Sequence, residues 1–222
     1  VNRSSTALYS GMVPGLIAGL YQRDNLSIDL RQLCDRAGVA FVEAEITGLN
    51  PEQNLLHLRN RPALHFNWLS LDVGAVSRPS AAGVPIKPLE TSLSFLESED
   101  PSDPNPLRVI GAGAAGLEVV LALRRRWPQR ELQLQQRRGQ LDPAVQHLLR
   151  KANIAVTDDD SHHNGPSLLC TGSLGPAWLA TAGLPVDSDG RVRTDRCLRV
   201  EGHPSLFALS LIHISEPTRR VE

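Results

Sequence analysis

The residues whose types and spacing suit chemistry form one glycine-rich run, GAGAAG at 111–116. This GxGxxG follows the short apolar segment 107–110 and opens a segment with helical spacing. Gly111 permits a tight turn, Gly113 lets the backbone approach a pyrophosphate, and Gly116 lets the helix pack closely on the strand. The helix N-terminus would supply free N–H groups and partial positive charge to phosphates. The run predicts dinucleotide binding, and a glycine-rich turn without a ligand is the alternative.

The next predicted strand, 131–136, decides which nucleotide the loop would favour. A site for NAD usually places an Asp or Glu about 20 residues beyond the glycine loop, on the adenosine ribose. Here the strand ends with Gln135 and Gln136, followed by Arg137 and Arg138, and none of these is a carboxylate. Two arginines would suit the 2′-phosphate of NADP and favour it slightly. The alternative is a solvated basic turn on a site that does not discriminate between NAD and NADP.

The elements around the loop alternate between strand and helix. Helical spacing ends at Pro128, and a second helix and a third strand are predicted at 141–152 and 153–156. This βαβαβ order indicates a parallel sheet with crossover helices. Upstream, a short buried helix is predicted at 11–21, and Ser27 would cap a helix that ends at Gly38. Further strands are predicted at 39–49, 55–59, 65–74 and 167–172, with a turn at Asp189-Gly190.

Composition excludes several classes of function. The chain has 222 residues, of which 41% are hydrophobic and 21% charged, enough apolar material for a packed core. A formal net charge of −1 makes nucleic acid a poor partner. The longest apolar stretch contains Pro14 and is too short to span a bilayer. We therefore expect a cytoplasmic chain, although peripheral membrane association of a longer parent stays open.

No metal site, disulfide framework or hydrolase motif is predicted. Cys34, Cys170 and Cys197 lie far apart and form no CxxC pair. The run DDDSHH at 158–163 lacks a spacing that fixes a coordination geometry, so a solvated loop is the better interpretation. No serine lies in a GxSxG motif.

Several further motifs, taken together with the glycine loop, resemble one family. The most specific are YSGMVPG at 9–15 and HPSLFA at 203–208, and the GxGxxG extends to Glu118 as GxGxxGxE. Shorter matches are LSLDVG at 69–74, IKP at 86–88 and CTG at 170–172.

On these residues the chain resembles the FAD-dependent pyridine nucleotide-disulfide oxidoreductases, in particular the type II NADH dehydrogenase-like branch. That branch includes the flavoprotein module fused to selenophosphate synthetase. The resemblance implies an α/β fold with two nested Rossmann-like three-layer domains, both incomplete or abbreviated. It also implies FAD and NAD(P)H as cofactors, with hydride passing from NAD(P)H to flavin and on to a quinone or another small acceptor.

The resemblance and the spacing together nominate site residues. The NAD(P)H set comprises Gly111, Gly113, Gly116, Glu118, Gln136, Arg137 and Gly172. The flavin set comprises Tyr9, Pro14, Gly74 and Lys87. No catalytic acid or base is identified. The domains that follow are a partial FAD-binding domain at 1–92, a linker at 93–106, an abbreviated NAD(P)-binding domain at 107–172, a return to the FAD-binding domain at 173–208 and a tail at 209–222.

The chain also departs from the family pattern. It begins with Val1, without the GxGxxG that holds the FAD pyrophosphate, and the Gly-Asp pair expected after Ala208 is absent. The residues Leu209–Arg219 resemble a translated sequencing adapter, so we expect read-through in this tail and poor packing of it. We therefore expect a fragment that holds FAD weakly or not at all.

A second class of function is kept open. The altered second strand and the short NAD(P) domain also suit a non-catalytic nucleotide-binding or redox-sensor module that serves a selenophosphate synthetase, fused or separate. Bound flavin without turnover would distinguish this module from the enzyme.

Overall fold

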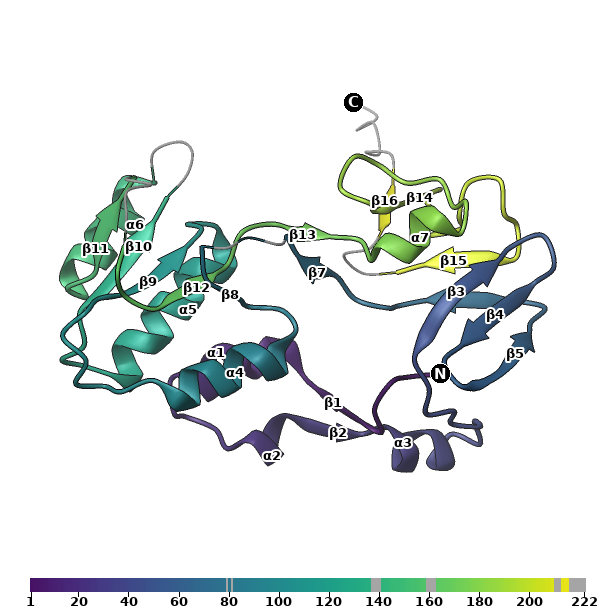
Figure 1. The fold of residues 1–222 in the computed structure, drawn as a ribbon, viewed down its shortest axis with the longest axis horizontal. Coiled ribbons are helices and arrows are strands. Elements are labelled where there is room, and N and C mark those ends of the chain that lie inside the picture. The colour runs from purple at the N-terminus through teal and green to yellow at the C-terminus, as the bar shows by residue number, and fades with distance from the viewer. Residues whose placement is uncertain (79, 81, 137–140, 159–162, 210–212, 216–222) are drawn as a thin grey trace. The chain divides into compact units, whose positions relative to one another are not determined.

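The computed structural model describes residues 1–78, 80, 82–136, 141–158, 163–209 and 213–215. The chain divides into two compact units (Figure 1). Unit 1 comprises Val1–Ala7, Ile28–Val76 and Ser173–Glu222. Unit 2 comprises Leu8–Ser27 and Ser77–Gly172 and contains the glycine loop, residues 111–116.

Unit 2 is built on a five-stranded sheet whose strands are all parallel, in the order β11-β10-β9-β12-β8. The strands are β8 (Val84–Pro85), β9 (Leu107–Ile110), β10 (Leu132–Gln135), β11 (Ala155–Thr157) and β12 (Ser167–Leu169). Every residue of β9 and of β12 is buried, as expected for central strands of a parallel sheet. The predicted parallel sheet with crossover helices is confirmed.

Helices cover this sheet and complete its core. They are η1 (Ser10–Met12), α1 (Val13–Ile17), α2 (Arg23–Leu26), α4 (Leu89–Ser98), α5 (Ala114–Arg126) and α6 (Pro143–Lys151). One hydrophobic cluster joins apolar side chains of α1, α4 and α5 to β9, β10 and β12. α5 is the crossover between β9 and β10, and α6 is the crossover between β10 and β11 (Figure 1).

Unit 1 consists of small sheets around a second hydrophobic cluster. An antiparallel sheet contains β3 (Ile46–Asn50), β4 (Leu55–Leu58) and β5 (Arg61–His65). Two parallel pairs are β6 (Leu69–Leu71) with β15 (Leu206–Ala208), and β14 (Val192–Thr194) with β16 (His213–Ser215). The helices are α3 (Leu30–Arg36) and α7 (Ala177–Thr181). Two short pairs, β1 (Thr6–Leu8) with β2 (Ser27–Asp29) and β7 (Val76–Ser77) with β13 (Ser173–Leu174), include residues where the chain passes from one unit to the other.

The predicted linker at 93–106 is wrong. Its first residues belong to α4, where Leu93 is 4% exposed and Leu96 is 2% exposed. The apolar spacing within the Ser- and Glu-rich segment buries one face of this helix in the core of unit 2. The remainder connects α4 to β9 within the same unit.

Other predicted elements are shorter than expected or displaced. The cap of α3 is Asp29, whose side chain accepts a hydrogen bond from the Gln32 N–H at 3.0 Å, whereas Ser27 belongs to β2. The strand predicted at 39–49 begins at Ile46, and the run 65–74 starts on the last residue of β5 and contains the short strand β6. Within the tail predicted at 209–222, the backbone of His213–Ser215 pairs in parallel with β14.

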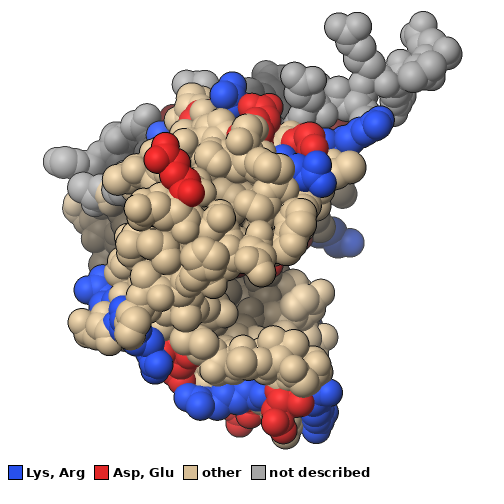
Figure 2. Space-filling model, turned by 90° about the vertical axis from the view of Figure 1, so that its right-hand side faces the viewer, with Lys and Arg blue, Asp and Glu red and all other residues tan. Residues whose placement is uncertain are grey.

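The surface of unit 1 seen in Figure 2 carries few charges over its centre. Lys and Arg side chains alternate with Asp and Glu at its margins, so neither sign forms a continuous field among the described residues in this view. Among the described residues, every helix is too short or too polar to cross a membrane.

Candidate functional site

The glycine loop joins β9 to α5 in a tight turn that only glycine permits at two positions. Gly111 has a φ of +113°, and a Cβ on it would lie 2.7 Å from the Cys170 carbonyl oxygen. A Cβ on Gly116 would lie 1.7 Å from the Gly111 carbonyl oxygen. These two glycines therefore let α5 begin directly against the end of β9, as the motif requires.

Gly113 differs from Gly111 and Gly116 because no described atom lies within 4 Å of a Cβ built on it. It is the N-cap of α5, with an ordinary φ of −76°, and a Cβ built on it would meet no atom within 4 Å. The Gly113 carbonyl oxygen accepts the hydrogen bond from the Leu117 N–H at 3.0 Å, which begins the helix. The open space lies at the N-terminus of a 13-residue helix, where backbone N–H groups and the helix dipole favour an anion.

Three arginines in the last turn of α5 complement the opposite end of its dipole. The first turn contains no acidic residue that would compete for the N-terminal N–H groups. Glu118 lies in the second turn and is exposed. The helix is therefore polarised toward binding an anion at the glycine loop.

The carboxyl end of β10 lies beside the loop. The Gly111 N–H donates to the Gln135 carbonyl oxygen at 2.8 Å, and the Gln136 N–H donates to the Thr157 carbonyl oxygen at 2.9 Å. Gln135 is 2% exposed, and Gln136 is half-buried. Gln136 is therefore held at the strand end where ribose-binding carboxylates stand in this class of site. Arg137 lies outside the described residues.

Cys170 and Gly172 follow β12 on the other side of the loop. The Cys170 N–H donates to the Ile110 carbonyl oxygen at 2.8 Å. Burial raises the pKa of the Cys170 thiol to about 12, so the thiol stays protonated and unreactive at neutral pH. Gly172 has a φ of +45° and open space around its Cα. The structure thus brings Gly111, Gly113, Gln136 and Gly172 to one edge of the sheet in unit 2.

The residues nominated for the flavin are divided between the units. Tyr9, Pro14 and Lys87 belong to unit 2, whereas Gly74, with a φ of +71°, belongs to unit 1. Tyr9 is 56% exposed, and its ring lies 3.1 Å from where a Cβ on Gly11 would stand. Pro14 lies in the first turn of α1. The Lys87 N–H donates to the Ser77 Oγ at 3.2 Å.

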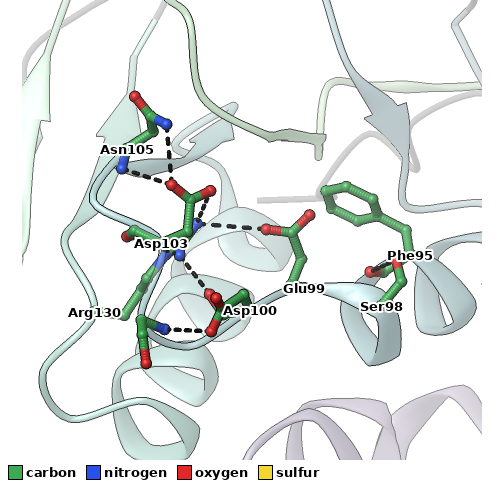
Figure 3. Close-up of polar contacts among 8 residues, drawn as sticks. Phe95, Ser98, Glu99, Asp100, Asp103, Asn105 and Arg130 are labelled. Carbon is green, nitrogen blue, oxygen red and sulfur yellow. Dashed lines mark hydrogen bonds and ion pairs between the residues drawn. The ribbon is translucent and has the colours of Figure 1, made fainter.

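Two arginines that the sequence analysis did not single out organise the opposite, amino-terminal edge of the sheet. The guanidinium of Arg130 is enclosed by the connection between α4 and β9 (Figure 3). That of Arg124 donates to four carbonyl oxygens in the connections after α5 and α6. A run rich in arginine gives no signal of which side chain is buried, so the pattern did not reveal them. Among the described residues, no group of three or more metal-ligating side chains is found.

Comparison with known proteins shows a likeness in structure alone. No protein-family model matches the chain, and no curated protein matches it. A NAD-dependent persulfide reductase from A. fulgidus matches 96% of this chain and 47% of its own, with TM-score 0.80 and 19% identity. The sulfide:quinone oxidoreductase from Aquifex aeolicus matches 96% of this chain over 61% of its own length, with TM-score 0.78 and 14% identity. A FAD-dependent pyridine nucleotide-disulphide oxidoreductase from Desulfovibrio vulgaris matches 79% of this chain over 54% of its own length, with TM-score 0.62 and 20% identity.

These likenesses establish the fold. The chain has the α/β, Rossmann-like fold of these oxidoreductases over most of its length. It spans about half the length of the solved chains that it matches.

Proposed function

We propose that this chain belongs to a FAD-dependent oxidoreductase that takes hydride from NAD(P)H, and that the glycine loop binds the NAD(P)H. The observation that carries the proposal is the open space at Gly113, framed by Gly111 and Gly116. The two framing glycines are required by the packing of the protein itself, whereas no described atom lies within 4 Å of a Cβ on Gly113, which leaves that space for a ligand. The likeness in fold to NAD-dependent and FAD-dependent oxidoreductases supports this assignment.

The residues of unit 2 have distinct roles in this proposal. The backbone N–H groups at the start of α5 bind the pyrophosphate, and the missing Cβ of Gly113 lets it approach. Gln136 faces the adenosine ribose, where its amide accepts or donates a hydrogen bond without repelling a 2′-phosphate. When bound, NAD(P)H supplies hydride and FAD accepts it. Tyr9, Pro14 and Lys87 of unit 2 are the positions that we propose near the flavin, whereas Gly74 of unit 1 stays a prediction of the resemblance alone.

We propose that the electrons leave to a quinone or another small acceptor. All three cysteines are free and form no disulfide, and Cys170 is kept protonated, so a dithiol route has no support among the described residues. The sequence holds one GxGxxG, which the proposal gives to NAD(P)H. We therefore expect this chain to hold FAD weakly. A selenophosphate synthetase partner stays a prediction of the resemblance alone.

The proposal is tested by anaerobic stopped-flow spectroscopy of the full chain with excess FAD. Mixing with NADPH or NADH is expected to bleach the flavin absorbance near 450 nm faster than free FAD is bleached, and a soluble quinone restores it. The Gly113→Val variant serves as the matched control, since we expect it to keep the fold and to close the loop to phosphates. Nucleotide binding without bleaching would overturn the oxidoreductase and leave a nucleotide-binding module.

A further inference from the structure

The connection between α4 and β9 is wrapped around one buried guanidinium. The side chain of Arg130 is 1% exposed. Its Nη1 donates to the carbonyl oxygens of Asp100 and, at 2.9 Å, Asp103. Its Nη2 contacts the carboxylates of Glu99 at 3.4 Å and Asp103 at 3.3 Å (Figure 3). Arg130 stands just before β10, so these contacts tie the start of β10 to the segment that enters β9.

The connection is shaped before it meets the arginine. The Asp100 Oδ1 accepts the Ser102 N–H at 2.8 Å, and the Asp103 Oδ1 accepts both the backbone N–H and the side-chain amide of Asn105 (Figure 3). These local turns hold the main-chain and side-chain oxygens that face Arg130. The two Nη groups of a planar guanidinium reach such a set from two points, although the Nε of Arg130 is buried without a hydrogen-bond partner among the described residues, whereas the ammonium of lysine offers donors from a single point.

Arg124 extends the same arrangement to the third strand. Its Nη1 donates to the carbonyl oxygens of Arg130 at 2.8 Å and Pro128 at 2.9 Å. Its Nη2 donates to the Asn153 carbonyl oxygen at 2.7 Å, in the turn before β11. Burial lowers the pKa of Arg124 from its usual value, although the guanidinium remains charged at neutral pH. Arg130 and Arg124, with the oxygens that they bind, are named here the guanidinium clamp.

The strands between the guanidinium clamp and the nucleotide site are only three or four residues long. At the amino end of the β9–β10 ladder, the Leu107 N–H donates to the Glu131 carbonyl oxygen at 3.0 Å. At the carboxyl end, the Gly111 N–H donates to the Gln135 carbonyl oxygen at 2.8 Å. A slip of β9 by one residue would turn its side chains to the opposite face of the sheet. It would also displace the glycine loop relative to the end of β10. Short strands gain little register specificity from their own side chains, so connections at their ends matter more.

We propose that Arg130 and Arg124 are positioning residues of the nucleotide site. They fix the amino ends of β9, β10 and β11, and the register thus set holds the glycine loop and Gln136 at the carboxyl ends. The expected change in NADPH affinity rests on the proposed function. The expected change in hydrogen exchange, which reports the strand register, rests on the fold alone.

The test measures hydrogen exchange and NADPH affinity in clamp variants of the full chain. Arg130→Lys retains a charge without the fork, and the triple variant Arg130→Met, Glu99→Gln, Asp103→Asn removes the charges together, so that none is left buried and unpaired. Arg125→Lys, at an exposed position of α5 beside Arg124, is the matched control. We expect the Gly111 N–H to exchange at least about tenfold faster in the clamp variants. The Kd for NADPH is expected to rise roughly tenfold or more, while circular dichroism shows a folded chain.

Faster exchange confined to residues 99–105, with Gly111 exchange and the Kd as in the unchanged chain, would overturn the inference. If the unchanged chain binds no NADPH, the proposed function fails, and the exchange of the Gly111 N–H still decides the positioning role. If the Arg130 variants do not fold, Arg124→Lys decides it, through faster exchange of the Gln136 N–H at the β10–β11 ladder. Unchanged exchange there contradicts the inference.

Discussion

Substitutions at Gly113 and Gly116 separate the glycine that serves a ligand from the glycine that serves the fold. A Cβ on Gly113 would meet no described atom within 4 Å, and the φ of −76° is open to any residue. Gly113→Val therefore changes the free energy of unfolding by about 1 kcal/mol or less, the usual range for an N-cap exchange. The new side chain occupies the open space at the helix N-terminus, and we expect the Kd for NAD(P)H to rise roughly 100-fold.

Gly116→Ala is expected to do the reverse. Its Cβ would lie 1.7 Å from the Gly111 carbonyl oxygen, a backbone atom that cannot move without shifting the loop. Overpacking of this kind costs about 3 kcal/mol. In a chain of this length that lowers the melting temperature by roughly 6–12 °C.

Calorimetry and fluorescence titration of NADPH on both variants provide the assay. A Gly113→Val chain that binds NADPH as tightly as the unchanged chain would refute the reasoning from open space. A Gly113→Val chain that melts as early as Gly116→Ala would refute the reading of the loop geometry.

Three further predictions concern single side chains. Gln136→Glu places a carboxylate at the end of β10, and we expect the ratio of NADPH to NADH affinity to fall roughly tenfold or more, measured by paired titrations. Because burial raises the pKa of the Cys170 thiol to about 12, Cys170 should resist iodoacetamide at pH 8 until the chain is unfolded. Mass spectrometry should find the exposed Cys197 alkylated under the same conditions. Prompt labelling of Cys170 would contradict its burial. Burial, and next the charge of Arg108, lower the pKa of His163 below 6.5, so its neutral form stabilises the fold above about pH 6.5 and this stability is lost as pH falls further. Urea midpoints at pH 8 and pH 5 should therefore differ less in His163→Gln than in the unchanged chain.

The region from β9 to β10 was predictable because its signals are local. Periodicity placed the strand, the glycine loop and α5, and each of Gly111 and Gly116 has the close backbone approach that the motif implies. The Asp189-Gly190 turn is likewise confirmed, with Gly190 at a φ of +74° and Val186 bridged to Val192. Turn chemistry and helix periodicity need only a few neighbouring residues.

What could not be predicted depends on contacts distant in sequence. The segment 93–106 has the composition of a linker, yet Leu93 and Leu96 are buried in a cluster that gathers side chains from elements before and after it in the chain. Arg130 contacts residues about thirty positions earlier, and its burial is offset only by oxygens that the fold brings there. In unit 1, β6 pairs with β15, which lies far along the chain, and the apolar run alone did not bound β6.

The most direct test of the central claim is a titration of the ¹⁵N-labelled chain with NADPH, followed by nuclear magnetic resonance. We predict saturable shifts of the backbone N–H signals of Gly113, Ala114 and Ala115, at the N-terminus of α5, together with Gln136 at the end of β10. The same signals should stay in place in the Gly113→Val chain. Shifts that do not saturate, or that leave the glycine loop unaffected, would contradict the claim that this loop binds NAD(P)H.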